Sequence, residues 1–241
     1  MQIDSDRCIA CKNCMEYCPA AAIEVDSNKG AVYISEELCF ECGLCLRLKI
    51  CTVDALYEPI EVSEFPRVLR SLFSNPNTTH RLTLVPGRGT EESKTNDVTG
   101  RIKRGEIGLC IELGRPGLGC SFKDISLMIL RLGRLGLELE PNNPLTALMD
   151  TGKGGFSKTV RAQRILSAII EVKLPADRLE EVIPAIIKVG QEIDTVFSLG
   201  VICRFGEQGE LPILERLMRL GIDVAPNAKI NLGMGRPLFK Y

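Results

Sequence analysis

The stretch CIACKNCMEYCP, residues 8–19, decides how this sequence is interpreted. It places cysteines at positions 8, 11, 14 and 18, and a proline follows the last of them. A second stretch, CFECGLCLRLKICT (residues 39–52), repeats the first three cysteines at 39, 42 and 45, but its fourth comes late, at Cys51, and Thr52 follows it. Cysteines at i, i+3 and i+6 cannot share one face of a straight helix or strand. Each triplet therefore suits a loop that curls around a compact metal core.

Composition limits the class of protein. The chain has 241 residues, of which 45% are hydrophobic and 25% charged, as in ordinary soluble globular proteins. No apolar run approaches the roughly 18 residues of a membrane helix, and the first residues lack the apolar core of a signal peptide. We therefore expect a cytoplasmic protein without a membrane segment. In a reducing compartment its eleven cysteines indicate metal binding before disulfides.

Cysteines and charges are distributed unevenly along the chain. Eight of the eleven cysteines lie within residues 8–51, and residues 1–60 hold ten acidic and five basic side chains, a net −5. The whole-chain charge of −1 then leaves +4 for the remainder. We expect three parts: a head (residues 1–60), a joining segment with a short helix and a long loop (61–100), and a body (101–241).

The head resembles the bacterial-type two-cluster ferredoxins. Its first stretch matches their run C-x2-C-x2-C-x3-C-P at every position, and the resemblance covers about the first quarter of the chain. Between the two stretches, AAIEVD and AVYIS are strand-like and are joined by SNKG, which predicts a β-hairpin. The resemblance implies two [4Fe–4S] clusters in which the fourth cysteine of each stretch completes the other cluster. The ligands would be Cys8, Cys11, Cys14 and Cys51 for the first cluster, and Cys39, Cys42, Cys45 and Cys18 for the second.

The late cysteine leaves alternatives open. Five residues separate Cys45 from Cys51 where the family has three. Either the extra residues bulge within LRLKI and still deliver Cys51, or Cys51 is displaced and the first cluster is a three-iron or labile one. Zinc is the competing metal, although two interlocked triplets offer more thiolates than a tetrahedral zinc site uses. We expect two intact clusters and a bulge with Arg47 and Lys49 facing solvent and Leu46, Leu48 and Ile50 as apolar cover.

The body alternates strands with helices, which predicts an α+β fold. RGEIGLCIEL alternates like a half-buried strand within 104–113, and Ser121 with Asp124 predicts the start of a helix over 121–136. LELEP is a short strand. A strand over 164–174, a helix over 176–190 that Pro184 should kink or divide, and a strand over 194–204 complete a β-α-β-β-α-β order. That order is a split-βαβ unit, with both helices on one face of an antiparallel sheet. The segments LPILERLMRLG and IDVAPNAKINLGM add a helix and a strand.

The joining segment offers fewer signals. EVSEFPRVLRSLF places Pro66 where a first helical turn tolerates proline, so a short helix follows. HRLTLV alternates like a strand and begins with His80, the single histidine, to which we assign no function. The body also loosely resembles small-molecule-sensing regulatory domains of the same topology, an architectural likeness that says little about function.

Three glycine-rich segments, GRGTEE, GRPGLGCS and GKGGFSKT, raise the question of phosphate binding. The last resembles the phosphate loop of the nitrogenase iron protein and partition-type ATPases, in which Lys153, Lys158 and Thr159 would contact phosphate and magnesium. A phosphate loop follows a buried strand and opens a helix, and the β-branched residues after GKGGFSKT do not favour a helix. We expect a basic loop instead. Cys120 precedes a helix and should have a lowered pKa, whereas Cys110 and Cys203 are predicted core residues.

Electron transfer is the function we expect. Two clusters would pass single electrons between a reductase and a partner enzyme complex in anaerobic metabolism, and the body would supply a docking or oligomer interface. We expect an electron carrier or electron-transfer subunit without catalytic residues, nucleic-acid partner or membrane partner. Two alternatives stay open: a redox- or ligand-responsive regulator whose body binds a small molecule, and an ATP-dependent activator that uses GKGGFSKT.

Overall fold

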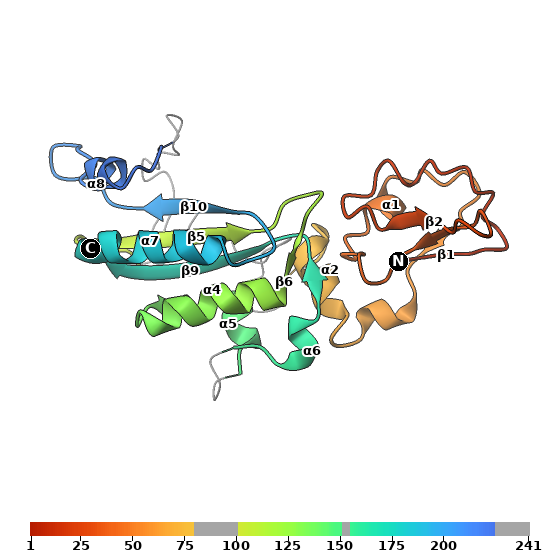
Figure 1. Cartoon of the computed structure of the whole chain (residues 1–241), viewed down its shortest axis with the longest axis horizontal. Coiled ribbons are helices and arrows are strands. Elements are labelled where there is room, and N and C mark those ends of the chain that lie inside the picture. Colours follow the sequence, from red (N-terminus) through yellow and green to blue (C-terminus); the bar gives the residue numbers. More distant parts are fainter. Residues whose placement is uncertain (80–100, 151–154, 225–241) are drawn as a thin grey trace.

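The head contains short strands held around the two cysteine stretches. In the computed structural model, which describes residues 1–79, 101–150 and 155–224, the head lies at one end of the molecule (Figure 1). Its elements are β1 (Gln2–Ile3), β2 (Ile23–Val25), β3 (Val32–Ile34), α1 (Leu44–Arg47) and β4 (Leu56–Tyr57). Strands β2 and β3 pair antiparallel, and the Asp26 N–H donates to Ala31 O at 2.8 Å across their turn. The predicted hairpin is therefore confirmed, while β1 pairs with β4 and closes the head.

The joining segment contacts both the head and the body. A 3-10 helix, η1 (Ile60–Ser63), packs Val62 against the small apolar core of the head. Helix α2 (Val68–Ser74) follows Pro66 as predicted, and it buries Leu69 and Phe73 in the core of the body. The expected strand HRLTLV, His80 and the segment GRGTEE lie outside the described residues.

The body is built on a four-stranded antiparallel sheet. Its strands are β5 (Glu106–Leu113), β7 (Glu138–Leu139), β9 (Ala168–Pro175) and β10 (Phe197–Ile202), in the spatial order β10-β5-β9-β7. The central pair runs in register from Glu106 opposite Pro175 to Leu113 opposite Ala168. Alternate residues of β5, from Ile107 to Leu113, enter the main core as the alternation predicts. The mixed helix-and-sheet class is therefore confirmed.

Two helices cover the sheet and contact each other, as Figure 1 shows. They are α4 (Phe122–Arg134) and α7 (Leu179–Gly190), and both bury apolar side chains in the core that β5 and β9 line. The predicted cap is confirmed, because Ser121 Oγ accepts from the Asp124 N–H at 3.1 Å and the Asp124 carboxylate accepts from the Ser121 N–H. Pro184 does not divide α7, which runs through it. The remaining helices among the described residues are α5 (Pro144–Leu148), α6 (Lys158–Arg161), η2 (Ala176–Arg178) and α8 (Leu214–Arg219).

The strand predicted over 164–174 is two strands. Strand β8 (Arg164–Ile165) pairs with β6 (Cys120–Ser121), and only β9 enters the central sheet. The change of partner occurs at Leu166, whose N–H donates to Ser74 Oγ of α2 at 2.8 Å. The extra helix expected in LPILERLMRLG is confirmed as α8, and most of IDVAPNAKINLGM lies outside the described residues. Within the described parts, no helix is long and apolar enough to cross a membrane.

Candidate metal centre

The two cysteine stretches fold into the same backbone shape. Ala10 (φ 52°) and Glu41 (φ 54°), each two residues after the first cysteine of their stretch, adopt the left-handed conformation. Lys12 (φ 66°) and Gly43 (φ 67°), each directly after the second cysteine, do the same. Left-handed backbone costs a non-glycine residue about 1–3 kcal/mol. Two loops that share this unfavourable shape are built to hold their cysteines in a particular arrangement.

The fourth cysteines are equivalent as well, despite the insertion. Ala21 (φ 50°) and Asp54 (φ 48°) lie three residues after Cys18 and Cys51 and are both left-handed. The next N–H in each case points back at the sulfur: Ala22 N lies 3.3 Å from Cys18 Sγ, and Ala55 N lies 3.2 Å from Cys51 Sγ. Cys51 is therefore the structural counterpart of Cys18. The two extra residues that precede Cys51 do not displace it from this turn.

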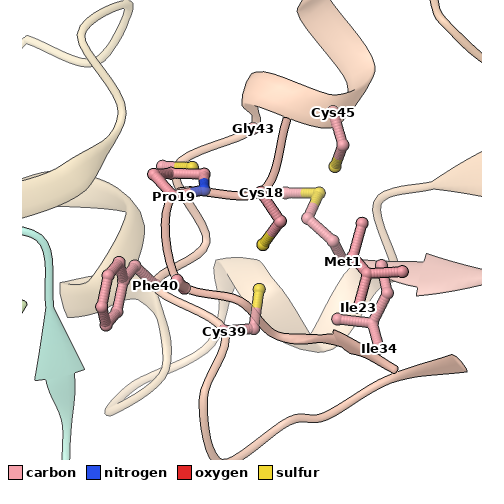
Figure 2. Close-up of a pocket in the computed structure, with 11 residues that line it drawn as sticks. Met1, Cys18, Pro19, Ile23, Ile34, Cys39, Phe40, Gly43 and Cys45 are labelled. Atoms are coloured by element: carbon pink, nitrogen blue, oxygen red, sulfur yellow. The ribbon is translucent and has the colours of Figure 1, made fainter. Parts of the chain in front are cut away.

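A cavity in the head collects cysteines from both stretches. Four thiols line it, those of Cys18, Cys39, Cys42 and Cys45, together with apolar side chains that include Met1, Ile23 and Ile34. Figure 2 shows the sulfurs of Cys18, Cys39 and Cys45 directed into this space. In the described part of the chain, no three cysteine, histidine or acidic side chains are grouped closely enough to hold one metal ion. The four thiols therefore line a cavity and do not converge on a single position that one ion could occupy.

Burial and mutual repulsion act on these thiols. Burial, followed by the Glu41 carboxylate, raises the pKa of Cys39 to about 12. Burial, followed by the nearby Cys42 and Cys18, raises the pKa of Cys45 to about 11. Burial also raises the pKa of Cys42. Thiols in this environment become thiolates only when a positive centre compensates the lost hydration.

The cysteines of the first stretch form a second group. Burial raises the pKa of Cys14, and the charges of Cys11, Cys8 and Cys51 raise it further against a backbone hydrogen bond that lowers it. Cys8, Cys11 and Cys51 thus all act electrostatically on Cys14, although Cys51 belongs to the second stretch. Cys11 is exposed and the other three are half-buried, so this group is more open to solvent than the group around Cys39.

The segment between Cys45 and Cys51 begins in a short helix, and some of its side chains lie in a different environment from the one predicted. Helix α1 runs over Leu44–Arg47, and Lys49 (φ 49°) then turns the chain toward Cys51. Lys49 is exposed as expected, but the prediction for Arg47 is wrong: its guanidinium donates to the carbonyl of Cys42 and to Asn75 Oδ1 (2.9 Å). Leu48 is 43% exposed and gives little cover, whereas Leu46 packs against the core of the head.

Both stretches contact the body, the first through the backbone of its last residue, Pro19, and the second through the buried ring of Phe40. Gly117 N donates to Pro19 O at 2.6 Å. The Phe40 ring lies against Gly119, where an added Cβ would overlap the ring. Both glycines belong to GRPGLG (residues 114–119, the glycine loop), and both have positive φ. The segment considered as a phosphate loop therefore contacts the head.

Two arginines, Arg67 directly before α2 and Arg70 within it, complete this junction. Arg67 donates to Glu41 Oε1 through Nη2 (2.6 Å) and Nε (2.9 Å), and the fully buried Glu41 also pairs with the N-terminal amine of Met1. Arg70 donates to the carbonyls of Glu36 and Cys39 and to Gln163 Oε1. Sequence reasoning missed these residues, because no local pattern relates α2 to partners 31 and 93 positions away.

The three scattered cysteines are not part of the centre. The prediction of a lowered pKa for Cys120 is wrong: burial, followed by the charge of Asp124, raises its pKa to about 12. Cys110 is buried in β5 as predicted. Cys203 follows the last residue of β10 and packs, half-buried, against the core.

Comparisons with known proteins agree with the head. Residues 1–24 match the family model of the 4Fe-4S binding domain, which confirms the resemblance to iron–sulfur ferredoxins. The chain is 35% identical over 54 residues to pyruvate synthase subunit PorD of Methanocaldococcus jannaschii, which is 22% of this chain and 59% of that protein.

A second match covers a much smaller share of the matched protein. The chain is 41% identical over 71 residues to an uncharacterised ABC transporter ATP-binding protein of the same organism, which is 26% of this chain and 12% of that protein. The chain thus spans less than two thirds of the length of either relative. No solved structure matches the chain.

Proposed function

We propose that the chain is an electron-transfer protein or subunit that carries two [4Fe–4S] clusters in its head. The observation that carries the proposal is the cavity that Cys18 shares with Cys39, Cys42 and Cys45, because Cys18 comes from the other stretch. Crossed ligation of this kind is what the two-cluster run requires. We assign Cys8, Cys11, Cys14 and Cys51 to the first cluster, and Cys39, Cys42, Cys45 and Cys18 to the second.

The donor set suits iron–sulfur clusters better than a single ion. A cubane takes one thiolate at each of four irons, so its ligands line a cavity, as these four thiols do. The N–H groups of Ala22 and Ala55 point at the sulfurs of Cys18 and Cys51, and such hydrogen bonds stabilise a thiolate and tune a cluster. When bound, each cluster would supply one-electron redox chemistry. The chain supplies ligands, hydrogen bonds and cover from water.

The partner we propose is an enzyme complex. PorD is by its name a subunit of pyruvate synthase, which favours a role in which this chain delivers electrons to, or takes them from, a larger oxidoreductase. The exposed first stretch offers a surface for that exchange.

We infer three parts of the chain, namely the head, the joining segment and a body of split-βαβ topology. The two separate apolar cores and the sheet order β10-β5-β9-β7 support this division. The ATP-dependent alternative gains no support from the described residues of GKGGFSKT. Asp150 N–H donates to Gly155 O (2.7 Å), and α6, which begins at Lys158 within this segment, has four residues.

Metal analysis of the anaerobically purified chain tests the proposal. We expect close to eight irons and eight sulfides per chain, since eight cysteines are placed for two cubanes. Zinc, or about four irons in a fully loaded sample, would overturn the two-cluster assignment.

A further inference from the structure

Arg70 is a buried cation between the second cysteine stretch and the body. Only 8% of the surface of Arg70 is exposed to solvent. Nη1 donates to Cys39 O at 3.0 Å and to the carbonyl of Glu36, and Nε donates to Gln163 Oε1 at 2.8 Å. One guanidinium thus joins the backbone of a candidate ligand to a residue directly before β8. Its hydrogen-bond partners among the described residues are uncharged oxygen atoms.

The charged groups around this position do not cancel. Arg67 is paired with Glu41 and reaches the exposed carboxylate of Glu36 at 3.1 Å. Arg47 donates to the carbonyl of Cys42 and to Asn75, the residue directly after α2. Three guanidinium groups therefore face the second stretch, and Glu41 is the buried carboxylate among them. Glu41 is already paired with Arg67 and the Met1 amine, so it compensates the charge of Arg70 only in part. A buried charge that is incompletely compensated is costly, so this environment favours negative charge in the cavity beside it.

The first stretch has different surroundings. Ile9, which corresponds to Phe40, is 63% exposed, whereas Phe40 is 2% exposed. The cations nearest in sequence to the cysteines of the first stretch, Arg7 and Lys12, are exposed. Solvent therefore screens their charges far more than it screens the charge of Arg70.

We infer that Arg70 is a positioning residue that holds the second cluster against the body and raises its reduction potential above that of the first. The inference rests on the proposed function. Four thiolates make a bound cluster anionic, and reduction adds one more negative charge, which a buried cation stabilises. An external one-electron donor would reduce the exposed first cluster. Transfer of that electron to the second cluster would oxidise the first by one electron, reduce the second by one electron, and leave the electron beside the body.

Potentiometric titration followed by electron paramagnetic resonance tests this inference on the full chain with both clusters. Arg70→Gln should shift the higher of the two midpoint potentials downward and leave the lower one in place. Arg70→Lys should retain most of the wild-type value, because it keeps the charge but not the planar fork. Arg131→Gln is the matched control, since it removes a guanidinium from α4 that pairs with Glu192, and it should move neither potential.

The remaining outcomes also decide the matter. Unchanged potentials in Arg70→Gln, or equal shifts of both, would overturn the inference, as would a Lys variant that behaves like the Gln variant. If Arg70→Gln does not retain eight irons, Gln163→Glu replaces it. This variant keeps an acceptor for Arg70 Nε and places a carboxylate against the guanidinium, so it should lower the same potential. Wild-type protein without two clusters would instead contradict the proposed function itself.

Discussion

The two cysteine stretches have the same spacing over their first three cysteines and the same left-handed turns, yet they lie in opposite surroundings. Ile9 is exposed to solvent, whereas its counterpart Phe40 is enclosed against Gly119 of the body. The carbonyls of Cys39 and Cys42 each accept a hydrogen bond from an arginine. Loops with the same cysteine spacing therefore share a backbone shape, while the rest of the fold determines the solvent access and the charge around each loop. Two similar clusters in such sites should differ in potential.

Removal of iron should have the largest effect on the structure. Both cysteine stretches should lose their order, so that they no longer differ. The buried apolar core of the head consists of Met1, Ala22, Cys39 and Val62, too little to order two strained loops without metal. Treating the protein with a chelator should abolish amide protection in residues 8–55. Hydrogen exchange measured by mass spectrometry would follow this, with β5 and β9 as the internal control that stays protected. A head that remains protected without iron would contradict the expectation.

Substitution of a single cysteine ligand should damage one cluster and leave the other intact. Cys51→Ala should remove one iron from the cluster held by Cys8, Cys11 and Cys14, and Cys18→Ala should remove one from the other cluster. Each variant should therefore contain about seven irons and show a three-iron signal in the electron paramagnetic resonance spectrum of the oxidised protein.

The crossed assignment makes these two variants each other's control. Cys51→Ala should leave the higher-potential cluster intact, and Cys18→Ala should leave the lower-potential one. If Cys51→Ala retains eight irons and both four-iron signals, Cys51 is not a ligand and the insertion breaks the family pattern.

Equivalent side chains should differ in their effect on stability. Phe40→Ala removes a fully enclosed ring and should cost about 3 kcal/mol of unfolding free energy. Ile9→Ala changes an exposed side chain and should cost less than about 0.5 kcal/mol. Urea denaturation under anaerobic conditions would compare the two midpoints. Equal losses would show that the surroundings of the two stretches do not differ energetically.

A smaller effect should come from the glycine loop. Gly119 has φ +66°, and a Cβ there would overlap Phe40 and lie 2.8 Å from Ile165 O. Gly119→Ala should therefore cost about 2 kcal/mol in the same denaturation assay. Gly117→Ala is the matched control, because Gly117 has φ +88° and open space around it. It should cost only about 1 kcal/mol, the penalty of left-handed backbone alone.

Local signals predicted much of the structure. The hairpin between the stretches, the Ser121–Asp124 cap and the alternation of β5 each depend on residues that are close in sequence, and each is confirmed. The expectations that failed depended on distant residues. Arg47 donates to Asn75, Cys120 is buried where its strand pairs with Ile165 of β8, and the strand expected over 164–174 divides where Ser74 accepts from Leu166.

By itself, the sequence predicted which cysteines would bind clusters and that each triplet would lie in a curled loop, because cysteine spacing acts over a few residues. Only the tertiary structure decided that the second stretch faces the body and gains a buried guanidinium from α2. The physical reason is distance along the chain: Arg70 lies 31 residues from Cys39 and 93 from Gln163. Contacts of that range arise when packed cores bring separate segments together, and no local pattern encodes them.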